Sequence, residues 1–181
     1  VNPSIQLLSP QAVPPSKLFQ LVDQQRDHLR QWLPWVDQTT EEAHSERFLK
    51  ESHLFNVGGQ RLTTFISFQN RLVGAVSLVR IDKHNKLAEI GYWIDREQQG
   101  QGIVTRSCQA LIRHVFTHKD LNRLEIRMAT GNTRSRKIPL KLGFSHELKL
   151  RQALRIHDTY HDLEVFALLK RDWIQQIRNN P

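Results

Sequence analysis

The chain has one cysteine, one methionine and two tyrosines, and it contains no long apolar run. A single thiol, Cys108, cannot form an internal disulfide, and without a second cysteine it makes no metal-ligand cluster. We therefore expect Cys108 to be a small buried residue on a helix. No segment is long or apolar enough to span a bilayer, so we expect no membrane partner.

The first fifteen residues also lack the basic segment and following apolar segment of a secretory signal, so we expect a cytoplasmic protein. With 181 residues, 39% of them apolar and 24% charged, the composition suits one globular domain spanning 1–181. We find no internal repeat and no linker that would divide it.

Positive charge is concentrated in the second half of the chain. Residues 91–181 carry 16 of the 26 Lys and Arg but only 9 of the 18 Asp and Glu. Such an excess suits nucleic acid, an acidic protein surface or a polyanionic cofactor. Charge alone does not choose among these partners.

Hydrophobic spacing predicts a strand at 5–8, a helix over 16–33 and a second helix over 40–53. Thr39 or Thr40 would cap the start of that second helix.

A change of period then predicts three consecutive strands, and the segments after them alternate between helix and strand. The expected strands are 63–68, 71–81, 86–94, 123–128, 145–154 and 160–169, and the expected helices are 103–119 and 132–142. Gly143 would end the last helix as its left-handed cap. A basic tail would follow the final strand.

The strongest local signal is the loop 99–105, Gln-Gly-Gln-Gly-Ile-Val-Thr, between a strand and a helix. Gly100 and Gly102 let consecutive N–H groups point outward at the positive end of the helix dipole. A diphosphate suits that arrangement. The loop is neither a Walker A loop nor a G-x-G-x-x-G fingerprint, because its spacing fails after Gly102.

Three motifs share one resemblance. They are Ala-Glu-Ile-Gly-Tyr-Trp-Ile at 88–94 followed by loop 99–103, Asn-Thr-Arg-Ser at 132–135 followed by Lys-Leu-Gly-Phe at 141–144, and His-Leu-Arg-Gln-Trp-Leu-Pro-Trp at 28–35. Together they resemble the GNAT superfamily of N-acetyltransferases and, within it, the RimL-like branch of ribosomal-protein-serine N-acetyltransferases. The resemblance covers nearly the whole chain.

This resemblance implies an α/β fold with a mixed, strongly twisted central sheet flanked by helices. Two central parallel strands, 86–94 and 123–128, would splay apart to admit acetyl-CoA, whose pantetheine arm would pair with exposed strand backbone. The residues that the resemblance assigns to the coenzyme are Trp93, Ile94, Gln99, Gly100, Gln101, Gly102, Ile103, Val104, Thr105, Asn132 and Ser135. Arg96 would add charge near the phosphates. Val104 departs from the family motif, which has glycine or alanine there.

The catalytic base is less clear from the resemblance, because the branch often carries a glutamate where this chain has Leu154. We predict Glu89 as the base, since strand alternation places it on the face of Gly91 and Trp93. Ser135 would act as the proton donor near the thiol.

Trp32 and Trp35 are expected to line the acceptor pocket together with Glu89, because the family places their segment over that site. Tyr160 and His157 are further candidate bases, since a histidine in the last turn could titrate near neutrality.

The predicted function is acetyl transfer from acetyl-CoA to a primary amine. The resemblance suggests the N-terminal amine of a ribosomal protein, with small amines and antibiotics as alternatives. An acyl-CoA-binding protein with little turnover is a further alternative, motivated by Leu154. A nucleic-acid-binding module is disfavoured because the coenzyme motifs already account for much of the charge, and a homodimer is common among similar proteins.

Overall fold

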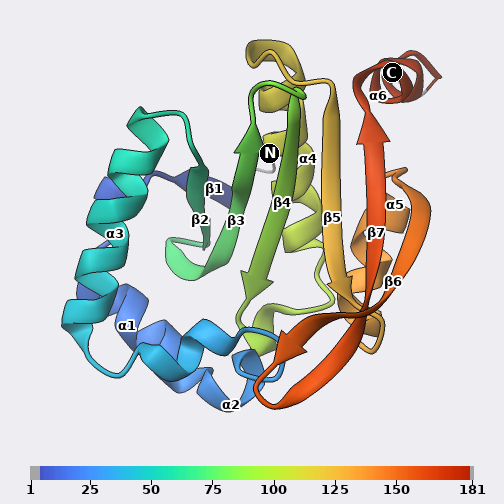
Figure 1. Cartoon of the computed structure of the whole chain (residues 1–181). Coiled ribbons are helices and arrows are strands. Elements are labelled where there is room, and N and C mark those ends of the chain that lie inside the picture. Colours follow the sequence, from blue (N-terminus) through green and yellow to red (C-terminus); the bar gives the residue numbers. More distant parts are fainter. Residues whose placement is uncertain (1–4, 180–181) are drawn as a thin grey trace.

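The computed structural model describes residues 5–179, which fold around one seven-stranded sheet of order β1-β2-β3-β4-β5-β7-β6. The strands are β1 Ile5–Leu8, β2 Leu62–Phe68, β3 Arg71–Asp82, β4 Leu87–Ile94, β5 Arg123–Ala129, β6 Ser145–Ile156 and β7 Thr159–Leu169. Neighbouring strands are antiparallel except β4 and β5, which are parallel (Figure 1). The mixed sheet predicted from the sequence is confirmed.

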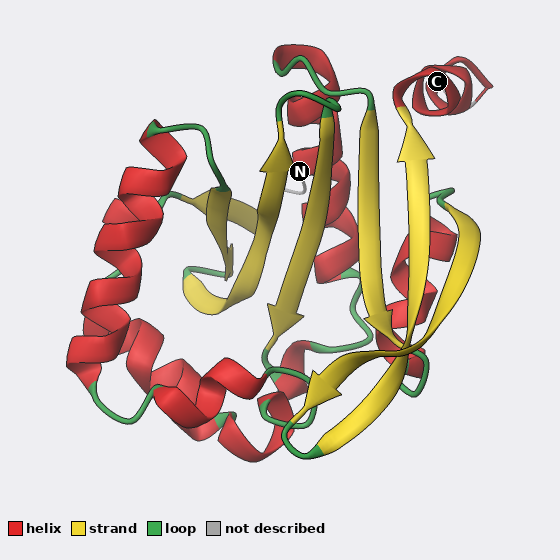
Figure 2. Ribbon diagram, viewed as in Figure 1, coloured by secondary structure: helices red, strands yellow, loops and turns green. Residues whose placement is uncertain are grey.

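Helices lie on both faces of this sheet (Figure 2). They are α1 Pro15–Gln24, α2 Arg26–Leu29, α3 Glu42–Val57, α4 Ile103–His118, α5 Thr133–Lys141 and α6 Lys170–Asn179. In Figure 1, α4 lies behind β4 and β5, whereas α1, α2 and α3 border the face turned to the viewer. Within residues 5–179, no helix has the length and apolar character needed to cross a membrane.

Two apolar clusters hold these layers together, one on each face of the sheet. Strand alternation separates them, because Ala75 of β3 packs under α1 and α3 while its neighbour Val76 packs against α4. Cys108 is fully buried in the α4 cluster, as the sequence predicted, and burial raises the pKa of its thiol. The sheet is therefore supported on both sides.

The two parallel strands separate part of the way along their length. Backbone pairing between β4 and β5 runs from Leu87 opposite Arg123 to Ile90 opposite Ile126, and stops there. Beyond Ile90, β4 continues to Ile94 paired only with β3, and β5 continues paired only with β7. The predicted splay is confirmed, and it leaves one edge of β4 free.

The strands and α4 match the sequence predictions to within two residues at each end. Gly143 has φ of +74°, so the left-handed cap of α5 is also confirmed. Local periodicity was sufficient for these elements.

The predicted helix over 16–33 is wrong in extent, because the chain breaks at Gln25 into α1 and α2. The side chain of Arg26 donates from this break to the carbonyl oxygens of Val36 and Thr39, at 2.7 and 2.6 Å. A tertiary contact therefore holds a break that the hydrophobic spacing did not indicate.

The predicted cap of the helix over 40–53 was also wrong. Neither Thr39 nor Thr40 caps α3, whose cap position is Glu41. The Thr40 amide instead donates to Nδ1 of His44, at 3.3 Å. The expected basic tail is the helix α6, whose Trp173 packs against a core phenylalanine of α4.

We predict that Gly74→Ala lowers the free energy of unfolding by about 1–3 kcal/mol, because overpacking forces a backbone shift. Gly74 lies opposite Ile94, where an added Cβ would overlap the Trp93 carbonyl oxygen and approach the Ile94 Cα to 2.9 Å. Denaturant titration measures the change. Gly58→Ala is the control, since its nearest atom would lie at 3.4 Å with φ of −70°. Equal midpoints for both variants would contradict this packing.

Candidate active site

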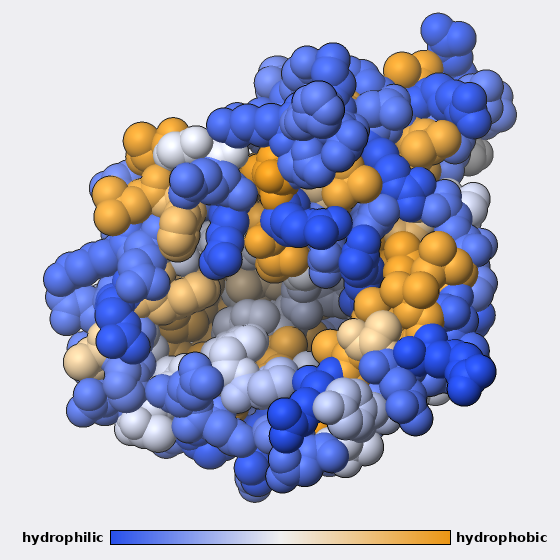
Figure 3. Space-filling model, in the orientation of Figure 1, coloured by the Kyte–Doolittle hydropathy of each residue, from blue (hydrophilic) through white to orange (hydrophobic). Residues whose placement is uncertain are grey.

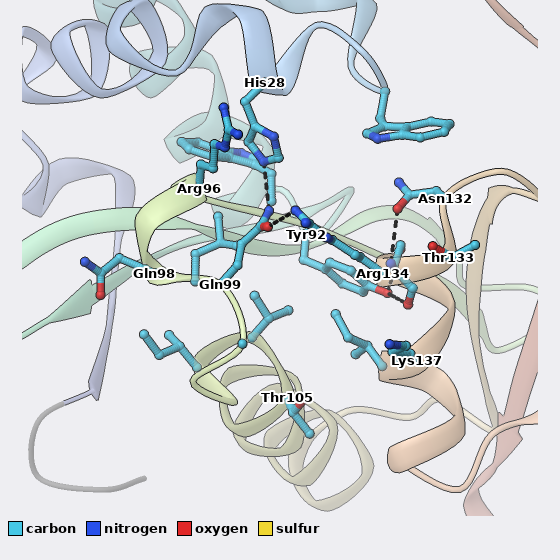
Figure 4. Close-up of a pocket in the computed structure, with 18 of the residues that line it drawn as sticks. His28, Tyr92, Arg96, Gln98, Gln99, Thr105, Asn132, Thr133, Arg134 and Lys137 are labelled. Atoms are coloured by element: carbon cyan, nitrogen blue, oxygen red, sulfur yellow. Dashed lines mark hydrogen bonds between the residues drawn. The ribbon is translucent and has the colours of Figure 1, made fainter.

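A cavity of about 900 Å³ opens where β4 leaves β5 (Figure 4). Its walls come from the free end of β4, the loop that leads into α4, the start of α5 and the segment 28–33. Segments far apart in the sequence thus meet where β4 and β5 diverge, a place that we call the fork. The volume lies within the range of about 300–1,000 Å³ that is typical of small-molecule sites.

Most of the residues predicted for coenzyme or acceptor binding line this one cavity. They are Trp32, Trp93, Ile94, Gln99, Gly100, Gly102, Ile103, Val104, Thr105, Asn132 and Ser135. Arg96, the predicted source of extra charge, lies in the same wall.

Three predicted residues do not line it. Gln101 turns its amide back onto its own turn, toward the Glu97 carbonyl and the Gln98 side chain. Trp35 lines a neighbouring cavity, where its ring packs 6.1 Å from that of Trp93. Glu89 lines neither cavity.

The loop before α4 forms an open backbone cradle. Gly100 and Gly102 have φ of +78° and +72°, a region that side chains rarely adopt. Nothing lies within 4 Å of a Cβ built at Gly100, and among residues 5–179 no side chain caps α4. A ligand oxygen can therefore approach the first amides of a helix of sixteen residues, where the dipole favours an anion.

Arg106 adds a cation that the sequence reasoning did not assign. Its terminal nitrogen lies 3.8 Å from the position that a Cβ on Gly102 would take. Its Nε is buried and has no hydrogen-bond partner within the described chain. A buried donor without a partner is costly, so this side chain suits an anion held in the cradle. The sequence offered one sign of this role, since Arg106 lies one helical turn after Gly102 and therefore near the loop.

A chain of hydrogen bonds crosses the mouth of the cavity from α2 to α5 (Figure 4). Arg134 donates to Oε1 of Gln99 at 2.6 Å, and Nε2 of Gln99 lies 2.8 Å from Nε2 of His28. Arginine only donates, so the Gln99 amide must turn its NH2 toward His28. His28 therefore accepts and is neutral. Burial, together with Arg96 and Arg134, lowers its pKa.

Ser135 lies beside a tyrosine that the sequence reasoning did not assign. The hydroxyl of Tyr92 lies 3.0 Å from Oγ and 3.1 Å from the carbonyl oxygen of Ser135. Burial raises the pKa of Tyr92 well above its usual range, so the phenol stays protonated. Asn132 accepts from the Ser135 amide at 3.1 Å and so caps α5.

Glu89 lies in the paired part of the sheet, two residues before the fork. Its carboxylate is 3.7 Å from the guanidinium of Arg127, which also binds the buried Glu125 at 2.7 Å. Burial raises the pKa of Glu89, although Arg127 and Arg80 oppose the shift. For Glu125, burial acts in the same direction, but hydrogen bonds from Arg127 and Arg123 leave its pKa lowered.

The other candidate bases lie outside the cavity. Tyr160 is exposed. His157 ties the β6–β7 turn to the N-terminal segment, with Nε2 2.9 Å from the Arg30 carbonyl and Nδ1 3.4 Å from Asp37. These contacts give His157 a structural role.

The GNAT acetyltransferase domain model matches residues 14–145. The ribosomal-protein-serine acetyltransferase of Escherichia coli strain K12 is 33% identical over 150 residues, which are 83% of this chain and 84% of that protein. The putative ribosomal N-acetyltransferase YdaF of Bacillus subtilis strain 168 is 33% identical over 171 residues, covering 94% of this chain and 92% of that protein.

Solved structures agree with these matches. RimL, the ribosomal L7/L12 alpha-N-protein acetyltransferase in complex with coenzyme A, superposes with a TM-score of 0.88 and 30% identity over 96% of this chain and 97% of that one. The microcin C7 self-immunity acetyltransferase MccE, in complex with acetyl-CoA and AMP, superposes with a TM-score of 0.89 and 28% identity over 93% of both chains.

We predict that the pKa of His28 lies below its ordinary value of about 6.5 and rises toward that value in Arg134→Gln, which removes one of the cations that lower it. Burial is the main cause of the lowered pKa. Because the folded-state pKa is depressed, the hydrogen bond from Gln99 stabilises fully above about pH 6.5 and is lost as the pH falls through the folded pKa. NMR titration of the imidazole ring measures both values. A pKa above 6.5 in the parent would contradict this arrangement, because burial, the two arginines and donation to the neutral ring all lower the pKa.

Proposed function

Because the chain belongs to the GNAT acetyltransferase family, we propose that its acceptor is the N-terminal amine of a protein. The chain is an N-acetyltransferase that uses acetyl-CoA. Its relatives include a ribosomal-protein-serine acetyltransferase and RimL, so a ribosomal protein is the acceptor we propose. We also propose that the protein acts in the cytoplasm, where acetyl-CoA and ribosomal proteins are both found. Residues 1–181 would then form one catalytic domain.

The observation that supports the coenzyme part of this proposal is the divergence of β4 and β5. One cavity joins the free edge of β4 to the uncapped start of α4, so an extended arm and an anionic group can be bound side by side. Main-chain groups of Trp93 and Ile94 would pair with the arm, and the cradle at Gly100–Thr105 would hold the diphosphate. Arg106 and Arg96 would add positive charge there.

Bound acetyl-CoA supplies the activated acetyl group as a thioester, and the chain's own residues position it and move protons. Ser135 and Tyr92 line the cavity as a hydrogen-bonded pair, and we assign Ser135 as the proton donor. Holding the two reactants in a fixed geometry removes much of the entropic cost of their encounter. An N-terminal amine has an ordinary pKa near 8, so a base is still useful at neutral pH.

We retain Glu89 as the proposed base. Its raised pKa and its place on the face of Gly91 and Trp93 support this role. Since its carboxylate does not line the cavity, it would act through intervening water.

A thiol-release assay with acetyl-CoA tests the function directly. The panel comprises N-terminal peptides, polyamines and aminoglycosides, and we expect release with the peptides. Release only with polyamines or aminoglycosides would refute the proposed acceptor. Binding of acetyl-CoA with no release on any amine would favour an acyl-CoA-binding protein without turnover, the alternative that Leu154 suggests.

We predict that Gly102→Val raises the Kd for acetyl-CoA at least about 10-fold, a loss near 1.4 kcal/mol, because a branched side chain disfavours the φ of +72° that shapes the cradle. Calorimetry measures the change. Gly59→Val is the matched control, since Gly59 has φ of +65° but lies outside the cavity. It should lose stability and keep its affinity. An unchanged Kd for Gly102→Val would remove the cradle as the diphosphate site.

We predict that Glu89→Gln lowers kcat/KM by roughly 10²–10⁴-fold, the usual contribution of a general base. The acidic limb of the pH–rate profile should disappear, because its carboxylate forms only above a raised pKa. Glu147→Gln is the control, since Glu147 is an exposed partner of Arg123 in the same network of charges. If the pH–rate profile of Glu89→Gln matches that of the parent, Glu89 is not the general base.

A further inference from the structure

A second cavity, of about 410 Å³, lies on the face of the sheet opposite α4. We call it the α3 trench, and we define it by its floor, Thr63, Ser77 and Gly91, and its roof, Ser45 and Phe48 of α3. Figure 3 shows this face of the molecule hollowed over the middle of the sheet, with α3 along one side.

We propose that the α3 trench binds the first side chain of the acceptor, and that it selects an uncharged side chain with one hydrogen-bonding group. This proposal rests on the proposed function and names the acceptor class of the same site.

Strand pairing explains the shape of the floor. Thr63 lies opposite Ser77, and Ser77 lies opposite Gly91, so three small residues form a row across β2, β3 and β4. The next row is Phe65, Ala75 and Trp93, so large rings stand at its two ends and a small residue lies between them. Side chains in one row point to the same face, so Thr63 and Ser77 form a trough beside taller walls, and Val79 of β3 covers Gly91, with Cγ1 2.8 Å from the position of an added Cβ.

The trough leads to the place where the acetyl group must be delivered. Gly91 is the first residue of β4 beyond the last pair with β5, at Ile90. The trench and the large cavity share Leu33, Tyr92 and Trp93 in their walls. An amine at the fork would therefore extend the group on its neighbouring carbon into the trench.

The roof contains a polar atom that needs a partner. Ser45 is 2% exposed, and its Oγ has no hydrogen-bond partner within residues 5–179. Such a buried hydroxyl costs about 1–3 kcal/mol when unsatisfied. Thr63 and Ser77 of the floor are also buried, so hydroxyls meet the occupant from two sides.

Charge at the trench disfavours a cationic side chain. Among residues 5–179, its lining includes Arg47, Arg61 and His44 but one carboxylate, Glu51, and most of the lining surface is apolar. A cation buried there would lose its hydration without a paired anion. An uncharged side chain with an apolar body and one hydroxyl or carbonyl satisfies both the walls and Ser45, whereas polyamines and aminoglycosides do not.

Kinetics with peptides that differ only in their first residue test the proposal. We expect kcat/KM to be highest for first residues Ser and Thr, lower for Val, which has the shape of Thr without its hydroxyl, and at least 10-fold lower for Lys and Glu than for Ser and Thr. Ser77→Leu fills the floor and should raise the acceptor KM at least 10-fold, while the KM for acetyl-CoA stays unchanged. Ser45→Val should remove the preference for Thr over Val.

Ser52→Val is the matched control, because Ser52 is a buried serine of the same helix that does not line the trench. It should keep parental kinetics. Thermal melting separates binding from folding, since Ser45→Val removes an unsatisfied hydroxyl and should be at least as stable as the parent.

Binding without turnover provides an independent measurement, because Trp35 and Trp93 both line the trench. Titration with threoninamide or serinamide should change tryptophan emission in the parent but not in Ser77→Leu, and lysinamide should bind at least 10-fold more weakly. Emission changes without acetyl transfer would refute the proposed function but would still support binding of the side chain in the α3 trench. Transfer that is insensitive to Ser77→Leu and Ser45→Val would refute the trench alone.

Discussion

The structure depends on the point at which two parallel strands stop pairing. β4 and β5 share four residue pairs and then diverge, each held by its other neighbour, β3 or β7. In a continuous sheet these backbone N–H and C=O groups would pair with the next strand. Here they remain available to a ligand, and leaving them without a partner costs free energy. The surrounding packing tolerates this because Gly74 lets β3 approach the free end of β4 closely.

The fold was largely predictable because its signals are local. Alternation in the strands, the amphipathic period of α4 and the glycine after α5 each act over one or two turns of chain. The break at Gln25 was not predictable, since Arg26 holds it through carbonyls ten and thirteen residues away. The free edge of β4 was expected from resemblance alone, because nothing in the residues themselves marks where pairing ends.

The candidate site likewise has features that the sequence predicts and features that depend on tertiary contacts. The cradle at Gly100 and Gly102 is a backbone feature, and sequence reasoning places it directly. The roles of Arg106, Tyr92 and the bridge through Gln99 depend on which helices meet across the cavity, and no single segment reveals them. Part of the positive charge of the second half of the chain also lies in the cavity walls, on Arg96, Arg134, Lys137 and Lys141.

The lone cysteine has a practical consequence. Cys108 lies in the core between α4 and the sheet with no exposed surface, and burial disfavours its thiolate. A disulfide reagent in solution attacks thiolates it can reach, so the native protein should add almost nothing to a colorimetric thiol signal. Free coenzyme can then be counted in the presence of the enzyme without a blocking step, and slow colour in a blank would report unfolding instead.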